Sequence, residues 1–184
     1  MRTSRKERLT IVQERPLQEV RIWIAVFITG LVLSGVTAFR LETELHWLLS
    51  MLNLSALRPI ALGIHLLPWI TRASDGLTKT NASYPFLAYG TDWLAFGHLV
   101  IATVFIGPYR DPVRNKWIID FGLIACAGVI PLALIAGHAR GIPLPWRLVD
   151  CSFGVFGALP LWRCRRLVSE MELRGQRPAR LRTK

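Results

Sequence analysis

The sequence predicts an all-α fold: an integral membrane four-helix bundle with one or two interfacial or re-entrant helices on the outer side. Three observations support this prediction. Hydrophobic residues make up 52% of the 184 residues. They gather in separate runs of about 17 to 20 residues, the length that crosses a bilayer as a helix. The 23 Lys and Arg residues, against 12 Asp and Glu, lie mostly at the chain ends and in one short connection between runs.

The first part of the chain predicts a basic tail and then a membrane span. Residues 1–21 are polar and basic, which is typical of a cytoplasmic tail. Residues 22–39 carry no charge and are long enough to cross the apolar core of a bilayer. Val36 and Ala38 also satisfy the small-residue rule for signal-peptide cleavage, but the polar lead of about 20 residues is long for a signal peptide. We therefore expect a retained helix.

The outer segment, residues 40–92, predicts helices that lie on the membrane rather than cross it. Leucines repeat at helical spacing in its first part, at Leu41, Leu45, Leu48 and Leu52, which indicates an amphipathic surface helix. A second apolar run, residues 58–70, is too short to span and is either interfacial or re-entrant. The polar stretch 71–83 is expected to be an exposed loop.

Three further apolar runs predict the remaining spans, at residues 93–109, 117–137 and 144–162, so that the membrane domain covers residues 22–162. Aromatic residues that favour the bilayer interface precede the first of them, at Tyr84, Tyr89 and Trp93. A short polar turn, residues 110–116, joins the second and third spans. Residues 163–184 form a second basic tail, predicted to end in a disordered stretch.

The distribution of charge predicts the orientation. Seventeen of the 23 Lys and Arg residues fall in the two tails and in the turn 110–116, and six fall elsewhere. The positive-inside rule therefore places both termini in the cytoplasm, with four passes through the membrane. The basic tails are expected to bind anionic lipid. The excess of basic residues accompanies long apolar runs. We therefore interpret it as a feature of a membrane protein, and we do not expect nucleic acid as a partner.

Polar residues inside the predicted spans are the candidate functional residues, because ionisable groups are costly in lipid. The candidates for binding a cofactor are His98 and His138. The candidates for a ligand pocket are Arg140, Arg147, Asp150 and Cys151. In the predicted topology they come from three spans and converge on the outer half of the bundle. They would form a pocket for haem b, quinone or a small polar ligand, with His46 and His65 as further candidate haem ligands.

The alternative is that these polar residues only hold helices together. Asp150 would then pair with Arg147 or Arg140, and His98 would bond to a neighbouring helix. In the fourth span a single stripe holds Arg147, Asp150, Gly154 and Ala158, and we expect this stripe to face other helices.

Asp120, near the inner end of the third span, predicts a salt bridge that closes the inner turn, with Arg110, Arg114 or Lys116 as its partner. The three cysteines, Cys126, Cys151 and Cys164, show no metal-binding spacing and are interpreted as small core residues. No metal site is expected.

No familiar catalytic or nucleotide-binding motif is present: there is no P-loop, no GxSxG, no HExxH and no GxGxxG after a strand. The composition and the candidate pocket predict a ligand-binding protein or an accessory subunit with a membrane protein partner or a second copy of itself. The alternative function is a redox protein that binds haem b or quinone between the second, third and fourth predicted spans.

Residues 84–162 resemble a group of small bacterial inner-membrane proteins of several spans, for which no activity is established. The segments that carry the resemblance are YPFLAYGTDWLAFGH, IGPYRDPVRNKWIIDFG, IPLALIAGHARGIP and WRLVDCSFGVFG. The resemblance implies a bacterial membrane location and implies nothing about chemistry.

Overall fold

The computed structural model describes the backbone of residues 5–54, 56 and 58–180, and the side chains of residues 15–54, 56 and 58–173. This part of the chain is helical, with no strand, as the sequence predicts. The elements are α1 (Arg5–Ala38), α2 (Leu41–Leu54), α3 (Arg58–Gly63), α4 (Leu66–Ser83), the 3-10 turn η1 (Pro85–Ala88), α5 (Tyr89–Val104), α6 (Ile106–Arg110), α7 (Lys116–Ala139) and α8 (Leu144–Arg180).

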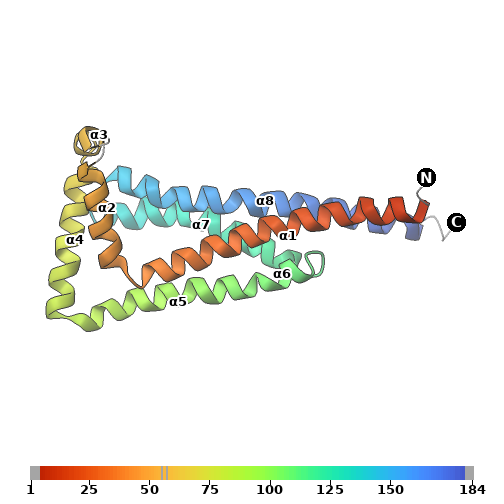
Figure 1. Ribbon diagram of the computed structural model, residues 1–184, viewed down its shortest axis with the longest axis horizontal. Helices are drawn as coiled ribbons and strands as arrows, with labels where there is room; N and C mark the ends of the chain where they lie inside the picture. The colour runs from red at the N-terminus through yellow and green to blue at the C-terminus, as the bar shows by residue number, and fades with distance from the viewer. Residues whose placement is uncertain (1–4, 55, 57, 181–184) are drawn as a thin grey trace.

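Four long helices, α1, α5, α7 and α8, run side by side (Figure 1). Contacts join α5 to α1, α1 to α8 and α8 to α7. The first residues of α1 and the last of α8 lie at the same end of the bundle, which we call the inner end (Figure 1). Helices α2, α3 and α4 pack on one another at the opposite, outer end, where they connect α1 to α5.

Three helical segments in the described part of the chain are long and apolar enough to cross a membrane: Arg15–Ala38, Pro85–Arg110 and Lys116–Ala139. These segments correspond to the first three predicted spans. The first predicted span, residues 22–39, ends one residue after the first segment. Helix α8, which contains the fourth, is not among them. Its apolar part is interrupted by Arg147 and Asp150, and these charges lower its mean hydropathy.

The best-packed region of the bundle is its inner half. The buried cluster joins three helices and the residue that follows α5. Its members are Val20 and Ile24 from α1, Phe105 between α5 and α6, Ile118, Ile119 and Cys126 from α7, and Leu161, Cys164, Leu167 and Val168 from α8. Phe105 is fully buried, with its ring centroid 4.7 Å from that of Phe27. Burial of this cluster holds the four long helices together at this end.

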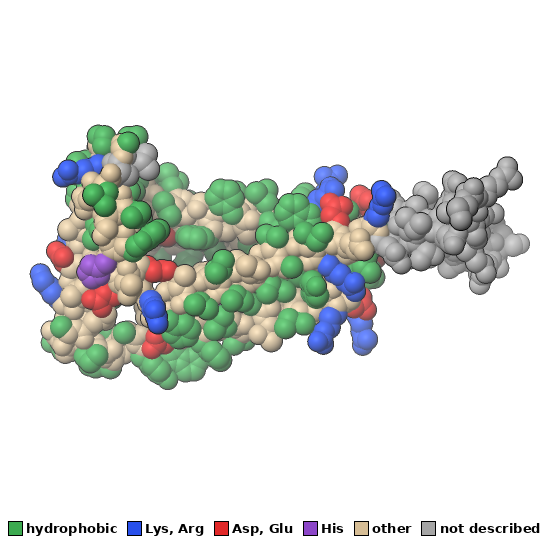
Figure 2. Space-filling model, viewed as in Figure 1, with side chains coloured by type: hydrophobic (Ala, Val, Ile, Leu, Met, Phe, Trp, Pro, Cys, Tyr) green, Lys and Arg blue, Asp and Glu red, His purple; other side chains and the backbone are tan. Residues whose placement is uncertain are grey.

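Towards the outer end the bundle separates into two helix pairs. The α1–α5 pair diverges from the α7–α8 pair, and the surface is recessed between them (Figures 1 and 2). Within the first pair the small residues Gly35, Ala95 and Ala102 are buried, so α1 and α5 stay close. Helices α7 and α8 stay close as well, because Gly154 lies on the backbone of α7 at Cys126.

The outer segment corrects one prediction. Residues 71–83, expected to be an exposed loop, are helical and form most of α4. The helix is amphipathic: Leu67, Ile70 and Ser74, at spacings of three and four, are buried. Thr78 Oγ1 and Asn81 Nδ2 also donate hydrogen bonds of 2.7 and 2.8 Å to the Glu42 carboxylate of α2. These contacts with a distant segment stabilise the helical conformation of residues 71–83, which their composition alone does not predict.

The apolar run 58–70 is divided between α3 and α4. His65 separates the two helices and adopts the left-handed conformation, with φ 58°. The amphipathic helix predicted from the leucine repeat is confirmed as α2, with Leu45 buried.

The segments predicted as tails are continuous with the long helices. Helix α1 begins at Arg5, and α8 continues to Arg180. The second tail is therefore helical over residues 163–180, and residues 181–184, on which the predicted disordered end falls, lie outside the described residues. The stretch 163–173 is helical because it packs on its neighbours: Cys164, Leu167 and Val168 are buried.

Charged side chains gather at the two ends of the bundle. On the face shown in Figure 2, Lys, Arg, Asp and Glu side chains cluster near the inner end and around α2–α4, and the surface between them is apolar. Helix α7, with 24 residues, is about 36 Å long, enough to cross the apolar core of a bilayer. The charge distribution and the helix lengths together identify a membrane protein.

Candidate functional site

The candidate pocket residues lie along the outer half of the contact between α7 and α8, which we call the α7–α8 seam. Arg147 is the most constrained of them. Its Cγ and Cδ atoms pack over Gly137, where a Cβ would come within 2.7 Å of Cδ. Its Nη1 donates a 3.2 Å hydrogen bond to the carbonyl of Leu134. The guanidinium thus lies near the C-terminal end of α7, where the helix dipole favours a cation.

The Nε of Arg147 is buried and has no hydrogen-bond partner in the part of the chain that the structure describes. A buried donor without a partner costs free energy of about 1–3 kcal/mol. Because the protein encloses this atom, an acceptor from outside the chain would reach the exposed part of the half-buried Arg147 side chain and not its Nε.

Asp150 lies on the same stripe of α8 and is half-buried. Ion pairs within residues 15–173 join Glu19 to Arg163, Lys116 to Glu172 and Asp120 to Arg165, and none joins Asp150 to Arg147 or Arg140. The alternative that Asp150 pairs with Arg147 or Arg140 is therefore wrong. Arg147 instead uses a backbone carbonyl, and Arg140 is exposed at the C-cap of α7.

Cys151 is half-buried in the seam, with its Sγ 3.9 Å from the carbonyl oxygen of Ile130. Cys126 and Cys164 are buried, as expected for small core residues. Cys164 Sγ lies 3.6 Å from the carbonyl oxygen of Val20, where it contributes to the contact between α8 and α1.

An apolar groove continues the seam towards the middle of the bundle. It has a volume of about 340 Å³ and is lined by Leu123, Cys126, Ala127, Ile130, Gly154, Val155, Ala158, Leu159 and Trp162. The expectation that Gly154 and Ala158 face other helices is confirmed, since Gly154 is buried on α7 and Ala158 packs against the inner core. The seam therefore changes from polar at its outer end to apolar at mid-depth.

The two candidate cofactor ligands lie on different helix pairs. His98 is on α5 and packs against α1, where its Cβ lies 3.1 Å from the position of a Cβ on Gly35. Its Nδ1 is 2.8 Å from the carbonyl oxygen of Leu94, one turn earlier. His138 is exposed near the end of α7. The bond to Leu94 fixes the His98 ring and leaves its Nε2 for another partner.

The two further candidate haem ligands lie in the outer segment. His46 is on α2, with its Nδ1 2.8 Å from the carbonyl oxygen of Glu42. His65 is exposed at the junction of α3 and α4. Among the described residues no group of three or more His, Cys, Asp or Glu side chains has the arrangement of a metal site.

Asp120 has a different partner from the one predicted. Instead of closing the inner turn, its carboxylate pairs with Arg165 Nε from α8, and Arg165 also donates a 2.7 Å bond to Ser169. Lys116 pairs with Glu172 of α8. The turn 110–116 is held by Asn115, whose Nδ2 donates to the carbonyls of Gly107 and Asp111. The partners were missed because α8 was expected to end at residue 162.

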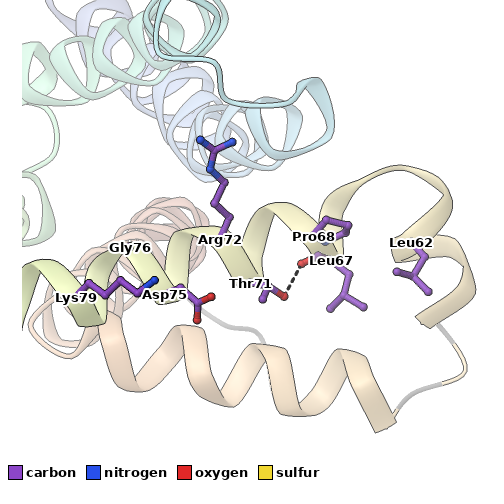
Figure 3. A pocket seen from close by; sticks show the side chains of 8 residues that line it. All are labelled: Leu62, Leu67, Pro68, Thr71, Arg72, Asp75, Gly76 and Lys79. Atoms are coloured by element: carbon purple, nitrogen blue, oxygen red, sulfur yellow. Dashed lines mark hydrogen bonds between the residues drawn. The ribbon is translucent and has the colours of Figure 1, made fainter.

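Sequence reasoning also missed a hollow of about 650 Å³ at the outer end. It is lined by one face of α4 and by one residue of α3: Leu62, Leu67, Pro68, Thr71, Arg72, Asp75, Gly76 and Lys79. Figure 3 shows that Arg72 points away from the side on which Thr71 and Asp75 lie. Thr71 Oγ1 donates a 3.0 Å bond to the carbonyl of Leu67, so its hydroxyl is already used within α4. The hollow is open, and its charged side chains do not converge.

No family model, no curated protein and no solved structure matches this chain.

Proposed function

We propose that the chain is a four-span protein of the bacterial inner membrane that binds a small amphiphilic or polar ligand at the outer half of the bundle, alone or as an accessory subunit. The observation that carries the proposal is the contrast between the two halves of the bundle. The inner half has a buried core, whereas the outer half is recessed and keeps half-buried polar residues such as Arg147 and Asp150.

Helix α8 is the proposed fourth span. It packs along α7, and its contacts include the close approach of Gly154 to the backbone of α7. If α7 crosses the bilayer, α8 lies beside it over the same depth (Figure 1). Its two charged residues are tolerable there because they lie near its outer end and Arg147 hydrogen-bonds to α7.

The proposed orientation places the inner end of the bundle in the cytoplasm. The Lys and Arg residues of the turn 110–116 and of the stretch 163–173 lie at that end, as the positive-inside rule requires. The exposed residues Arg110, Arg114 and Arg166 would face the headgroups of anionic lipids. Tyr84, Tyr89 and Trp93 would mark the outer interface.

Replacement of Asp150 tests the ligand site. The full chain would be purified in mild detergent as wild type and as Asp150→Asn, and bound small molecules would be identified by native mass spectrometry. We expect a bound species in the wild type that is lost from a variant with the same yield and elution volume. A bound species retained in the variant, or none in the wild type, would contradict a site at Asp150.

A redox protein is the second candidate, and it rests on His98, whose Nδ1 contact leaves Nε2 for a haem iron. A reduced-minus-oxidised visible spectrum of the purified chain tests it. A sharp haem b band that is lost in His98→Ala would support this candidate. A flat spectrum would exclude haem and leave quinone, which fits the polar-to-apolar change along the seam.

A further inference from the structure

We propose that the α7–α8 seam holds an anionic phospholipid of the outer leaflet, with an acyl chain in the apolar groove and the phosphate against Arg147. This inference rests on the proposed function, because it requires α8 to cross the bilayer with Leu144 on the outer side. It goes further by assigning a phospholipid to the seam, beside the ligand site that is tested at Asp150, and by naming the two parts of the seam that recognise the lipid.

The groove fits an acyl chain by its composition and its place. Its nine lining residues include no charged side chain. Val155 is exposed by 50% and Trp162 by 62%, so the groove opens away from the bundle, towards lipid. Gly154 and Ala158 form its floor, because their small side chains leave space where α7 and α8 meet.

The outer end of the seam fits an anionic headgroup. Arg147 lies three residues, about 4.5 Å, beyond the start of α8, which is the depth of the outer headgroups in the proposed topology. Its side chain is half-buried, so part of the guanidinium can meet a phosphate, and the Nη1 bond to Leu134 fixes the guanidinium in place. Arg140, exposed at the end of α7, adds a second positive charge nearby along the chain.

The two parts are continuous. Cys151 approaches Ile130, which lines the groove, and Arg147 approaches Leu134, one turn further along α7. From Arg147 to Val155 the distance along the helix is about 12 Å, well within the length of an acyl chain. A phospholipid with its phosphate at Arg147 therefore places a chain along the groove.

The negative charge of Asp150 does not lie in the path of the proposed lipid. It lies seven residues before Gly157, so the two share a face of α8. A Cβ on Gly157 would lie 3.0 Å from Cys126 Sγ of α7 and 3.5 Å from Phe27 of α1, so this face lies between α7 and α1, and Asp150 does not line the groove. The carboxylate thus lies on the recessed side between the two helix pairs, outside the groove.

Competitive lipid binding tests the inference. The purified, delipidated full chain would be mixed with equal amounts of phosphatidylglycerol and phosphatidylcholine, and the bound lipids counted by native mass spectrometry. We expect the wild type to prefer phosphatidylglycerol. Arg147→Gln should lower that preference about fivefold, the effect of one basic residue at a membrane surface. Val155→Trp, which fills the groove from its open side, should reduce binding of both lipids.

Val149→Trp is the matched control. It makes the same substitution at an exposed residue of α8 that does not line the groove, and it should leave binding of both lipids unchanged. Equal binding of the two lipids by the wild type, or equal effects of Val155→Trp and Val149→Trp, would overturn the inference. If Arg147→Gln does not fold, the two Trp variants still decide the question. Labelling that shows α8 does not cross the membrane would instead overturn the proposed function.

Discussion

Gly154 of α8 lies against Cys126 of α7 so closely that a Cβ on Gly154 would come within 2.5 Å of the Cys126 carbonyl oxygen. This contact brings the two backbones together at the apolar groove, which both residues line. A stripe of small residues allows such an approach in lipid, where dispersion contacts between helices replace the hydrophobic effect.

Gly154→Ala should therefore destabilise the bundle by about 1–3 kcal/mol, the usual cost of adding a methyl group to a packed contact. The measurement is unfolding of the purified protein in a mixed detergent titration. Gly128→Ala is the control, because a Cβ there meets nothing within 4 Å in the same helix pair. The control should be neutral or slightly stabilising. Equal destabilisation by both variants would show that the close approach is absent.

The ion pair between Asp120 and Arg165 should give a measurable coupling energy. Both side chains are partly exposed, at 42% and 31%, so we expect only about 0.5–1 kcal/mol from a double-mutant cycle with Asp120→Asn and Arg165→Gln. The same cycle with Arg114→Gln should give no coupling. Coupling to Arg114 in place of Arg165 would restore the salt bridge within the inner turn that the sequence predicts.

Glu42 should make the contact between α2 and α4 depend on pH. Hydrogen bonds from Thr78 and then from Asn81 hold the pKa of this carboxyl below its ordinary value of 4.5. Because the folded pKa is lowered, the stabilisation is present above about pH 4.5 and is lost as the pH falls through the folded value.

Glu42→Gln removes this titration, and Glu44→Gln, at a half-buried carboxylate two residues further along α2, would serve as the control. The difference in melting temperature between wild type and Glu42→Gln should be constant near neutral pH and shrink in acid. A difference that grows as the pH falls would contradict the lowered pKa.

The sequence predicts the apolar runs and the stripe of Gly154 and Ala158 well, because chain composition and helical spacing determine both. It does not predict α4, whose buried face includes Ser74 and whose stability depends on Glu42, more than thirty residues earlier. The partner of Asp120 is missed for a related reason. It depends on the register of α8 against α7, and on α8 remaining helical beyond residue 162, which packing by Cys164 and Val168 ensures.

For the candidate site, the sequence identifies the polar residues of the outer half but not how they are used. The sequence leaves open whether Arg147 lines a ligand pocket or pairs with Asp150, and in the structure it bonds to a backbone carbonyl beside Gly137. The apolar groove depends on the space between two packed helices, which no residue pattern within one helix specifies.

The most direct test of the account is the side of the membrane on which each end of α8 lies. In a variant without Cys126, Cys151 and Cys164, single cysteines would be introduced as Ser83→Cys, Arg114→Cys and Leu173→Cys and labelled with an impermeant maleimide. In intact spheroplasts we expect Ser83→Cys to react, and Arg114→Cys and Leu173→Cys to react only after permeabilisation. Labelling of Leu173→Cys from outside, with Arg114→Cys protected, would show that α8 does not cross the membrane. This result would contradict the proposed four-span topology.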